Sequence, residues 1–410
     1  MRIIIASQTY SPGNGQASFT IQLAENMIRR GHQVMVITPS ENMSSYSTYK
    51  NDVRIEMVPA VHLSLLHPSI YITPLPALRI KKLFSTFQPD VVHIQDHYFL
   101  CSAVVTEARR RAIPLIGTNH FLPENILPFL KNLPSLQHLF TIPLWKMMLA
   151  VFNKLDVVTT PSKTAARILN AQKIRIPVHA ISNGVDTNRF KPNPKVDRVG
   201  VRRKYGLAAD KFLLLYVGRL DGEKRLDILL EAFALLPRDN IQLAICGQGL
   251  YDQVLRKQMQ ALELEGRVHF IGFAQPEDLP NLYNSADIFV MPSPQELQSI
   301  ATLEAMACGK PILAADARAL PELVQTGTNG YLFKSNNPKD AAQGIEYLMG
   351  ASDKWPEMGR VGFERARLHS LENSIKHYEE HYRTITERIQ VKSSQVASTQ
   401  KKYAERLSGR

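Results

Sequence analysis

The chain has 410 residues, which is too long for one ordinary hydrophobic core and suits two domains. Hydrophobic residues make up 44% of it and charged residues 21%, which excludes collagen-like, mucin-like and wholly disordered proteins. The net charge is +12, and residues 1–190 are the more basic half, with 19 Lys and Arg against 10 Asp and Glu. Such a chain can meet an anionic membrane or a phosphorylated substrate. Without a zinc-finger, RNP-type or helix-turn-helix pattern, no nucleic-acid partner is expected.

The three cysteines are Cys101, Cys246 and Cys308, and each lies in an apolar segment far from the others. This spacing favours small buried side chains in a reducing compartment over a disulfide framework or a zinc site. We therefore expect no bound metal. The first residues predict a strand and lack the features of a cleavable leader, so a cytosolic protein is expected.

Short runs rich in Val and Ile alternate with helical periodicity along the chain, which is typical of parallel sheets covered by helices. After a first strand at 2–7 and a helix at 17–30, the first half predicts strands at 34–38, 53–58, 91–94, 115–118, 157–160 and 178–181. The pattern breaks at 191–201, around Pro192 and Pro194. It restarts with strands at 212–217, 242–246, 269–271, 288–291 and 312–315. The predicted fold class is α/β, with two Rossmann-like doubly wound domains.

The predicted domain organisation has five parts. These are an N-terminal domain at 1–190, a linker at 191–208, a C-terminal domain at 209–368, a helix at 369–391 that packs back on the N-terminal domain, and a polar tail at 392–410. The tail has no hydrophobic period, so we expect it to be frayed. Open parallel sheets bind ligands at the carboxyl ends of their strands, so the site is expected in a cleft between the two domains.

Two glutamates eight residues apart follow the predicted strand at 288–291. Glu296 falls on the strand-to-helix turn, and Glu304 falls inside a helix that begins near Ser299 and Ile300. Carboxylates accept hydrogen bonds from vicinal hydroxyls, and free N–H groups at a helix start bind phosphate oxygens. The combination fits a nucleotide sugar. Taken alone, the pair also fits one surface glutamate and one ordinary helix glutamate.

A second motif follows the strand at 212–217 and contains Gly218, Arg219 and Lys224. Two cations at the carboxyl end of a strand form a diphosphate clamp and can neutralise a leaving group. By themselves they also fit a solvated turn. Gly247, after the next strand, allows a tight turn near a nucleotide, but the full dinucleotide-binding glycine pattern is absent.

Together these motifs resemble the retaining glycosyltransferases of family 4, which have the GT-B fold of two facing Rossmann-like domains. The resemblance covers most of the chain, including residues 10–15, 181–190 and 321–331. It implies a hexosyltransferase whose donor substrate is a nucleotide-diphosphate sugar, with UDP-glucose as the expected kind, and which needs no cofactor or metal. The implied route is displacement on the front face of the sugar, with the donor phosphate helping to deprotonate the acceptor. Covalent attack by Glu296 is the alternative.

The resemblance also assigns roles to residues. The catalytic residues it implies are His120, Glu296, Arg219 and Lys224, and the donor-binding residues are Gly15, Gly218, Arg219, Lys224, Gly247, Ser299, Ile300 and Glu304. Arg219 and Lys224 would hold the diphosphate, Glu304 the ribose, and Glu296 would face the transferred sugar. Gly15 would let the N-terminal domain close over the phosphates, and His120 would lie near the reacting centre.

Some of these positions leave alternatives open. His120 and His93 both lie at predicted strand ends, where a hydrogen-bonded core histidine is common. Ser162 fits either a helix N-cap or a site residue. Gln16 and Arg225 depart from the family pattern, because many members have glycine at both places.

The acceptor is the least determined part of the prediction, because the fold does not select it. The basic first half favours a membrane lipid, and so do residues 136–152, an apolar segment in which Trp145 and Lys146 could act as interfacial anchors. The same segment also fits a helix buried in the N-terminal domain. Pro143 and Lys146 interrupt it, so no membrane-spanning helix is predicted.

Two short motifs refine this expectation. Glu296-Leu-Gln-Ser299 and Asn14-Gly-Gln-Ala-Ser18 are similar to sequences frequent among bacterial diacylglycerol glucosyltransferases. We therefore expect a peripheral enzyme on the inner face of the cell membrane that glycosylates a lipid. The alternatives are a soluble family 4 enzyme of polysaccharide or small-glycoside synthesis and a non-catalytic subunit that binds nucleotide sugars.

Overall fold

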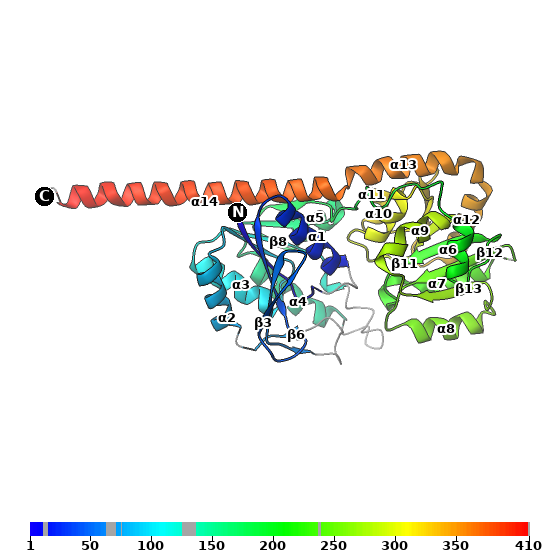
Figure 1. Ribbon diagram of the computed structural model, residues 1–410, viewed down its shortest axis with the longest axis horizontal. Helices are drawn as coiled ribbons and strands as arrows, with labels where there is room; N and C mark the ends of the chain where they lie inside the picture. Colours follow the sequence, from blue (N-terminus) through cyan, green and yellow to red (C-terminus); the bar gives the residue numbers. More distant parts are fainter. Residues whose placement is uncertain (11–14, 63–70, 75, 125–136, 237–238, 409–410) are drawn as a thin grey trace.

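The computed structural model describes residues 1–10, 15–62, 71–74, 76–124, 137–236 and 239–408. The first-loop motif at residues 11–14 and residue 136 of the apolar segment lie outside them. The described chain forms two α/β halves that lie side by side, and its last helix runs back from the second half along the first (Figure 1).

The first half is built on one eight-stranded sheet in the order β10-β9-β8-β7-β1-β2-β4-β3. Its strands are β1 (Arg2–Ala6), β2 (Gln33–Pro39), β3 (Tyr46–Lys50), β4 (Val53–Val58), β7 (Val91–Ile94), β8 (Leu115–Thr118), β9 (Val157–Thr160) and β10 (Val178–Ala180). Its helices are α1 (Gly15–Arg29), α2 (Ala77–Phe87), α3 (Phe99–Arg110), α4 (Gln137–Phe152) and α5 (Lys163–Asn170). A separate hairpin pairs β5 (Val61–His62) with β6 (Tyr71–Ile72).

The second half is built on a six-stranded parallel sheet in the order β13-β12-β11-β14-β15-β16. Its strands are β11 (Phe212–Val217), β12 (Ile241–Cys246), β13 (Val268–Gly272), β14 (Ile288–Met291), β15 (Ile312–Asp316) and β16 (Gly330–Lys334). Its helices are α6 (Arg198–Lys204), α7 (Leu226–Ala234), α8 (Asp252–Ala261), α9 (Leu279–Ser285), α10 (Ile300–Ala307), α11 (Leu320–Leu323), α12 (Pro338–Gly350) and α13 (Trp355–Leu368).

The central strands of both sheets are buried along nearly their whole length, because helices cover both faces. This is why continuous apolar runs predict them well. The sequence analysis does not predict β3, whose five residues are all exposed and mostly polar, or β16. The three cysteines are buried and unpaired, as expected.

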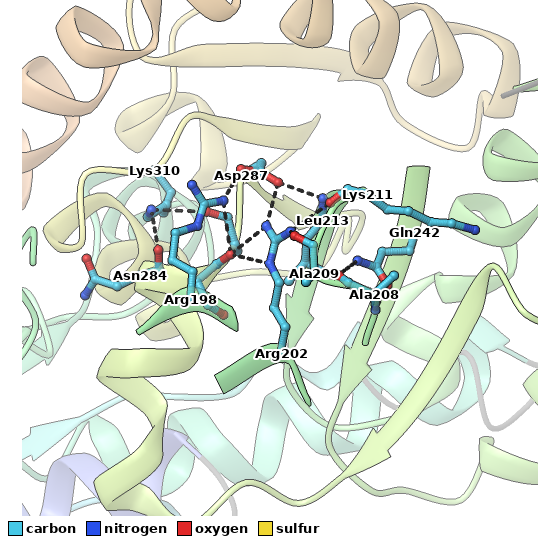
Figure 2. A network of polar contacts seen from close by, with 12 residues as sticks. Arg198, Arg202, Ala208, Ala209, Lys211, Leu213, Gln242, Asn284, Asp287 and Lys310 are labelled. Carbon is cyan, nitrogen blue, oxygen red and sulfur yellow. Dashed lines mark hydrogen bonds and ion pairs between the residues drawn. The ribbon is translucent and has the colours of Figure 1, made fainter. Parts of the chain in front are cut away.

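The segment predicted as a linker contains a helix that belongs to the second half, which corrects that prediction. The guanidinium of Arg202 on α6 donates to the carbonyl oxygens of Ser285, Ala209 and Lys211, and its Nη2 lies 2.8 Å from Asp287 Oδ2. Figure 2 shows Arg198 and Arg202 directed at Asp287, and Lys310 directed at Asn284. The buried Arg202–Asp287 pair and the more exposed Arg198–Asp287 pair therefore attach α6 to the loop before β14.

The last helix, α14 (Leu371–Ser408), packs on the first half and then extends past it (Figure 1). Tyr378 and Tyr382 are fully buried in a core that includes Ile3 and Phe19. The sequence analysis predicts a frayed tail after residue 391, but in the structure residues 392–408 continue this helix. The segment from 371 to 408 contains neither glycine nor proline, so nothing in its backbone chemistry stops the helix.

Candidate active site

Both sheets change the direction of their strand order at one point. In the second sheet this point lies between β11 and β14, and in the first it lies between β1 and β7. Loops that leave neighbouring strands in opposite directions at such a point make room for a ligand. The two predicted donor-site motifs follow β11 and β14, so the structure brings them to the same place.

Glycines shape the turns that follow β11 and β12. The φ angle of Gly247 is 145°, and a Cβ atom on it would lie 1.8 Å from the carbonyl oxygen of Gly218. The Gly218 N–H donates to the Cys246 carbonyl oxygen at 3.0 Å. Only glycine fits at position 247, because any side chain would collide with the neighbouring backbone. The predicted glycine turn is therefore a close contact between two strand ends.

Charged side chains from the two motifs form one connected chain. Arg219 Nη2 lies 2.6 Å from Glu223 Oε1, which lies 3.6 Å from Lys224 Nζ. Lys224 Nζ in turn lies 2.7 Å from Glu296 Oε1. Arg219 also pairs with Asp221. Of the four charged residues expected to bind the donor, the structure therefore brings three together, and the fourth is Glu304.

Among the residues of this ion-pair network, Glu223 is the one to which the sequence analysis gives no role. Its side chain is buried and lies between the two cations. Burial alone would lower the pKa of Lys224, but the carboxylates of Glu296 and Glu223 outweigh burial and raise it above its ordinary value. Lys224 therefore keeps its positive charge at neutral pH. The signal for Glu223 was its position four residues after Arg219 on a turn that becomes helical.

Glu304 occupies a separate place deeper in α10. This helix begins as predicted, with the hydroxyl of Ser299 accepting the Thr302 N–H at 3.2 Å and Ile300 as its first residue. The Tyr283 hydroxyl donates to Glu304 Oε2 at 2.7 Å. Burial raises the pKa of Glu304 to about 7, although the Tyr283 hydrogen bond and the charge of Arg189 oppose the rise. The sequence analysis did not identify Tyr283, which comes from the preceding helix.

The raised pKa of Glu304 predicts a pH dependence of donor binding. If its carboxylate accepts hydrogen bonds from donor hydroxyls, the ionised form binds better, so donor affinity should increase as the pH rises through about 7. Glu304→Gln should bind the donor more weakly and lose this pH dependence. Titration calorimetry with a UDP-sugar between pH 5.5 and 8.5 measures both effects. The same pH dependence in the variant would contradict the assignment.

The stability of the protein should change with pH in the opposite direction. Because the folded pKa of Glu304 lies above its ordinary value of 4.5, its proton stabilises the folded state below that value, and this contribution is lost as the pH rises toward about 7. Thermal unfolding of wild type and Glu304→Gln over this range would separate the contribution of Glu304 from that of other groups.

The first half contributes Gly15 and His120. A Cβ atom on Gly15, at the start of α1, would lie 3.6 Å from Ile300 Cδ1 at the start of α10, so the two helix starts lie close together. His120 is partly exposed, with its Nε2 2.9 Å from Gln95 Oε1 and its ring 5.2 Å from that of Phe19. The protein atoms packed around the ring keep water from most of it and lower the pKa of His120 to about 3, so the ring is neutral at physiological pH.

The other candidate residues of this half have structural contacts. His93 is fully buried, with its ring nitrogens 2.7 Å from the hydroxyl oxygens of Tyr382 and Thr118. Ser162 caps α5 by accepting the Ala165 N–H at 3.1 Å. His93 is therefore a hydrogen-bonded core histidine, and Ser162 is a helix N-cap.

Side chains next to Glu296 join the two halves. Leu297 is buried in the core cluster of the first half. Gln298 Oε1 accepts the Asn183 N–H at 2.8 Å. The carboxylate of Glu322, on α11, accepts the N–H groups of Lys163 and Thr164, at the start of α5. Contacts of residues before and after α10 in the chain thus hold the second half against the first.

The apolar segment at 136–152 contains α4, and the structure corrects the interpretation of Trp145 as a membrane anchor. The Trp145 side chain is buried, and its indole N–H donates to Glu124 Oε1 at 3.0 Å. Met148 and Phe152 on the same face are fully buried, while Ile142 and Lys146 are exposed. Trp145 therefore packs in the core. No helix within the described part of the chain combines the length and apolarity needed to cross a bilayer.

Comparison with known proteins identifies the family. Residues 13–189 match the family described as Glycosyltransferase Family 4, and residues 198–362 match the one described as Glycosyl transferases group 1. The chain belongs to glycosyltransferase family 4. The second match begins at the first residue of α6, which agrees with the placement of that helix in the second half.

Relatives of this family 4 glycosyltransferase are named for different compounds. It is 28% identical over 340 residues to an alpha-monoglucosyldiacylglycerol synthase of Streptococcus pneumoniae, covering 81% of this chain and 75% of that protein. It is 29% identical over 386 residues to a D-inositol 3-phosphate glycosyltransferase of Mycolicibacterium smegmatis, covering 89% of this chain and 86% of that protein. The relatives thus leave the acceptor undetermined.

Solved structures confirm the GT-B fold. A sucrose-phosphate synthase from Thermosynechococcus elongatus has a TM-score of 0.78 at 20% identity, covering 94% of this chain and 99% of that one. HepE of Anabaena in complex with UDP and glucose has a TM-score of 0.76 at 22% identity, covering 93% of this chain and 99% of that one. Among the described residues of the family 4 glycosyltransferase, no group of three or more His, Cys, Asp or Glu is placed to hold a metal ion.

Proposed function

We propose that this glycosyltransferase moves a hexose from a UDP-linked sugar to a hydroxyl of a membrane lipid such as diacylglycerol, with retention of configuration and without a metal. The observation that carries the transfer reaction is the connected chain of Arg219, Glu223, Lys224 and Glu296 at the point where the strand order of the second sheet reverses. A fixed guanidinium and a fixed ammonium suit the two phosphates of a nucleotide sugar.

Two carboxylates, those of Glu304 and Glu296, support the proposed donor as hydrogen-bond acceptors for its hydroxyl groups. Glu304, held by the Tyr283 hydroxyl, is a hydrogen-bond acceptor for ribose hydroxyls. Glu296, beside Lys224, is an acceptor for hydroxyls of the transferred sugar. The structural similarity to HepE in complex with UDP and glucose supports UDP as the nucleotide.

In the proposed reaction, the bond between sugar C1 and the diphosphate oxygen breaks while the acceptor oxygen bonds to C1 from the same face. The proton of the acceptor hydroxyl passes to the departing phosphate oxygen, so no protein nucleophile is needed. Arg219 and Lys224 stabilise the negative charge that develops on the diphosphate. His120 belongs to the first half, and in the proposed reaction its neutral ring orients the transferred sugar by a hydrogen bond.

A lipid acceptor is supported by the relative named alpha-monoglucosyldiacylglycerol synthase and by the basic first half of the chain. The experiment is incorporation of label from UDP-glucose into diacylglycerol held in vesicles with and without anionic lipid. Product should form, and vesicle binding should weaken at high salt. Glucosylation of a soluble sugar together with no activity on any lipid would reject the lipid acceptor.

A small soluble acceptor is the second candidate, because Trp145 is buried rather than exposed as an anchor and a relative acts on D-inositol 3-phosphate. Thermal-shift screening with nucleotide sugars comes first, since a ligand that binds only the folded protein raises its unfolding temperature. Hydrolysis of the donor by the purified protein, absent in Glu304→Ala, would separate an enzyme from a non-catalytic binding subunit.

A further inference from the structure

Three buried side-chain amides follow three neighbouring strands of the first sheet. Gln8 comes after β1, Gln95 directly after β7, and Asn119 directly after β8. Their exposed fractions are 3%, 0% and 2%. Adjacent parallel strands lie about 4.8 Å apart, so the three strand ends span about 10 Å.

Each of these amides has an atom without a hydrogen-bond partner. These atoms are Gln8 Oε1, Gln95 Nε2 and Asn119 Nδ2. Buried polar atoms are almost always paired, because an unpaired one loses its hydrogen bonds to water without replacement. Three unpaired atoms at the carboxyl ends of three neighbouring strands therefore need an explanation. A ligand that forms hydrogen bonds with them would be that explanation.

The contacts of these residues place them beside the proposed reacting centre. Gln95 Oε1 lies 2.9 Å from His120 Nε2, and Asn119 is the residue before His120. The Gln8 N–H donates to Asp96 Oδ2 at 2.6 Å, which joins the ends of β1 and β7. The strand order of the first sheet reverses between these two strands, which is the place where such sheets bind ligands.

The unpaired atoms also specify the chemistry of the ligand. Two are N–H donors and one is a carbonyl acceptor, a set that matches hydroxyl groups, which both donate and accept. Asp96 is buried at the same end of the sheet and already accepts the N–H groups of Gln8 and Tyr98, and its carboxylate would repel a phosphate. Within the described residues, no lysine or arginine side chain forms a hydrogen bond with any of the three amides.

We infer that Gln8, Gln95 and Asn119 form the acceptor subsite, and that this subsite selects an uncharged, hydroxyl-bearing group such as a glycerol or sugar moiety over its phosphorylated form. The inference rests on the proposed function, because it names the acceptor of that reaction. It separates the two curated relatives, since one is named for a glycosyldiacylglycerol and the other for an inositol phosphate.

The test compares matched acceptors with UDP-glucose as the donor. A 1-alkylglycerol is compared with its monophosphate, and inositol with inositol phosphate, so that charge is separated from lipid character. The wild type should prefer the uncharged member of each pair by at least tenfold in kcat/KM. A preference for the phosphorylated member would overturn the inference while leaving sugar transfer itself intact. Absence of any nucleotide-sugar binding would instead overturn the proposed function.

Two variants test the amides themselves. Asn119→Leu removes one unpaired donor. Gln95→Met removes the other together with the oxygen that contacts His120, so Asn119→Leu is the cleaner test of an amide by itself. Each should lower kcat/KM for the uncharged acceptor about tenfold, as expected for a lost hydrogen bond. UDP affinity, measured by calorimetry, should change less than twofold in Asn119→Leu, because the residues proposed to bind the diphosphate and the ribose, Arg219, Lys224 and Glu304, lie on the other half.

A matched control distinguishes a binding role from a structural one. Asn329 is also a buried asparagine, but its Nδ2 donates to the Leu323 carbonyl oxygen at 2.9 Å and its Oδ1 accepts the Gln325 N–H at 2.9 Å. Asn329→Leu should lower the unfolding temperature more than Asn119→Leu does, and should leave acceptor preference unchanged. If Asn119→Leu does not fold, Asn119→Asp replaces only the amide nitrogen and should show the same loss. Unchanged kcat/KM in the folded Asn119 variant would refute the assignment.

Discussion

Replacing Lys224 with methionine is expected to lower kcat/KM for sugar transfer by about a thousandfold. Methionine retains most of the apolar length of the side chain but removes the charge that stabilises the departing diphosphate. The ammonium lies 2.7 Å from Glu296 and its side chain is only 16% exposed, so little water is present to replace it. Electrostatic stabilisation is strongest where water is excluded. Steady-state kinetics of UDP release at saturating acceptor measure the effect.

The matched control for this variant is Lys204→Met. Lys204 Nζ lies 2.6 Å from Asp278 Oδ2, so it is also paired with a carboxylate, but its side chain is 58% exposed. Activity should stay within twofold of wild type, because exposed ion pairs contribute little. If the folded Lys224→Met protein keeps more than a tenth of the wild-type kcat/KM, the diphosphate clamp is assigned to the wrong residue. Thermal unfolding of both variants separates loss of chemistry from loss of fold.

Replacing Asp287 with alanine is expected to lower the free energy of unfolding by about 3–5 kcal/mol. Asp287 Oδ2 lies 2.8 Å from Arg202 Nη2 and accepts the Leu213 N–H at 2.8 Å (Figure 2). The Arg202 side chain is only 4% exposed, so the variant leaves a buried guanidinium without a counter-charge. Because this network attaches α6 to the second sheet, the loss should appear in chemical denaturation followed by circular dichroism.

An exposed pair in the same half provides the comparison for Asp287→Ala. Arg367 Nη1 lies 3.2 Å from Glu364 Oε2, and the two side chains are 60% and 51% exposed. Glu364→Ala should destabilise the protein far less, because both charges remain solvated. Equal losses in the two variants would show that burial of the Arg202 pair has no special energetic role.

The positions of the strands and of the donor-site residues follow from local chemistry and could be predicted. Strands buried on both faces need continuous apolar residues. The residues that come next in the chain, such as Gly218 and Glu296, must therefore lie at the carboxyl ends of the strands. The exposed strand β3 was missed for the converse reason. Its side chains face water, so no apolar pattern marks it.

Residue type and spacing along the chain thus defined two α/β halves, a family and a set of candidate donor-site residues. Which of these residues touch was decided by folding, because Lys224 meets Glu296 across 72 positions of the chain and Gln95 meets His120 across 25. The burial of Trp145, the place of α6 and the unpaired amides were likewise decided by tertiary contacts. A side chain's partner and its access to water depend on elements far away in sequence, which no local pattern records.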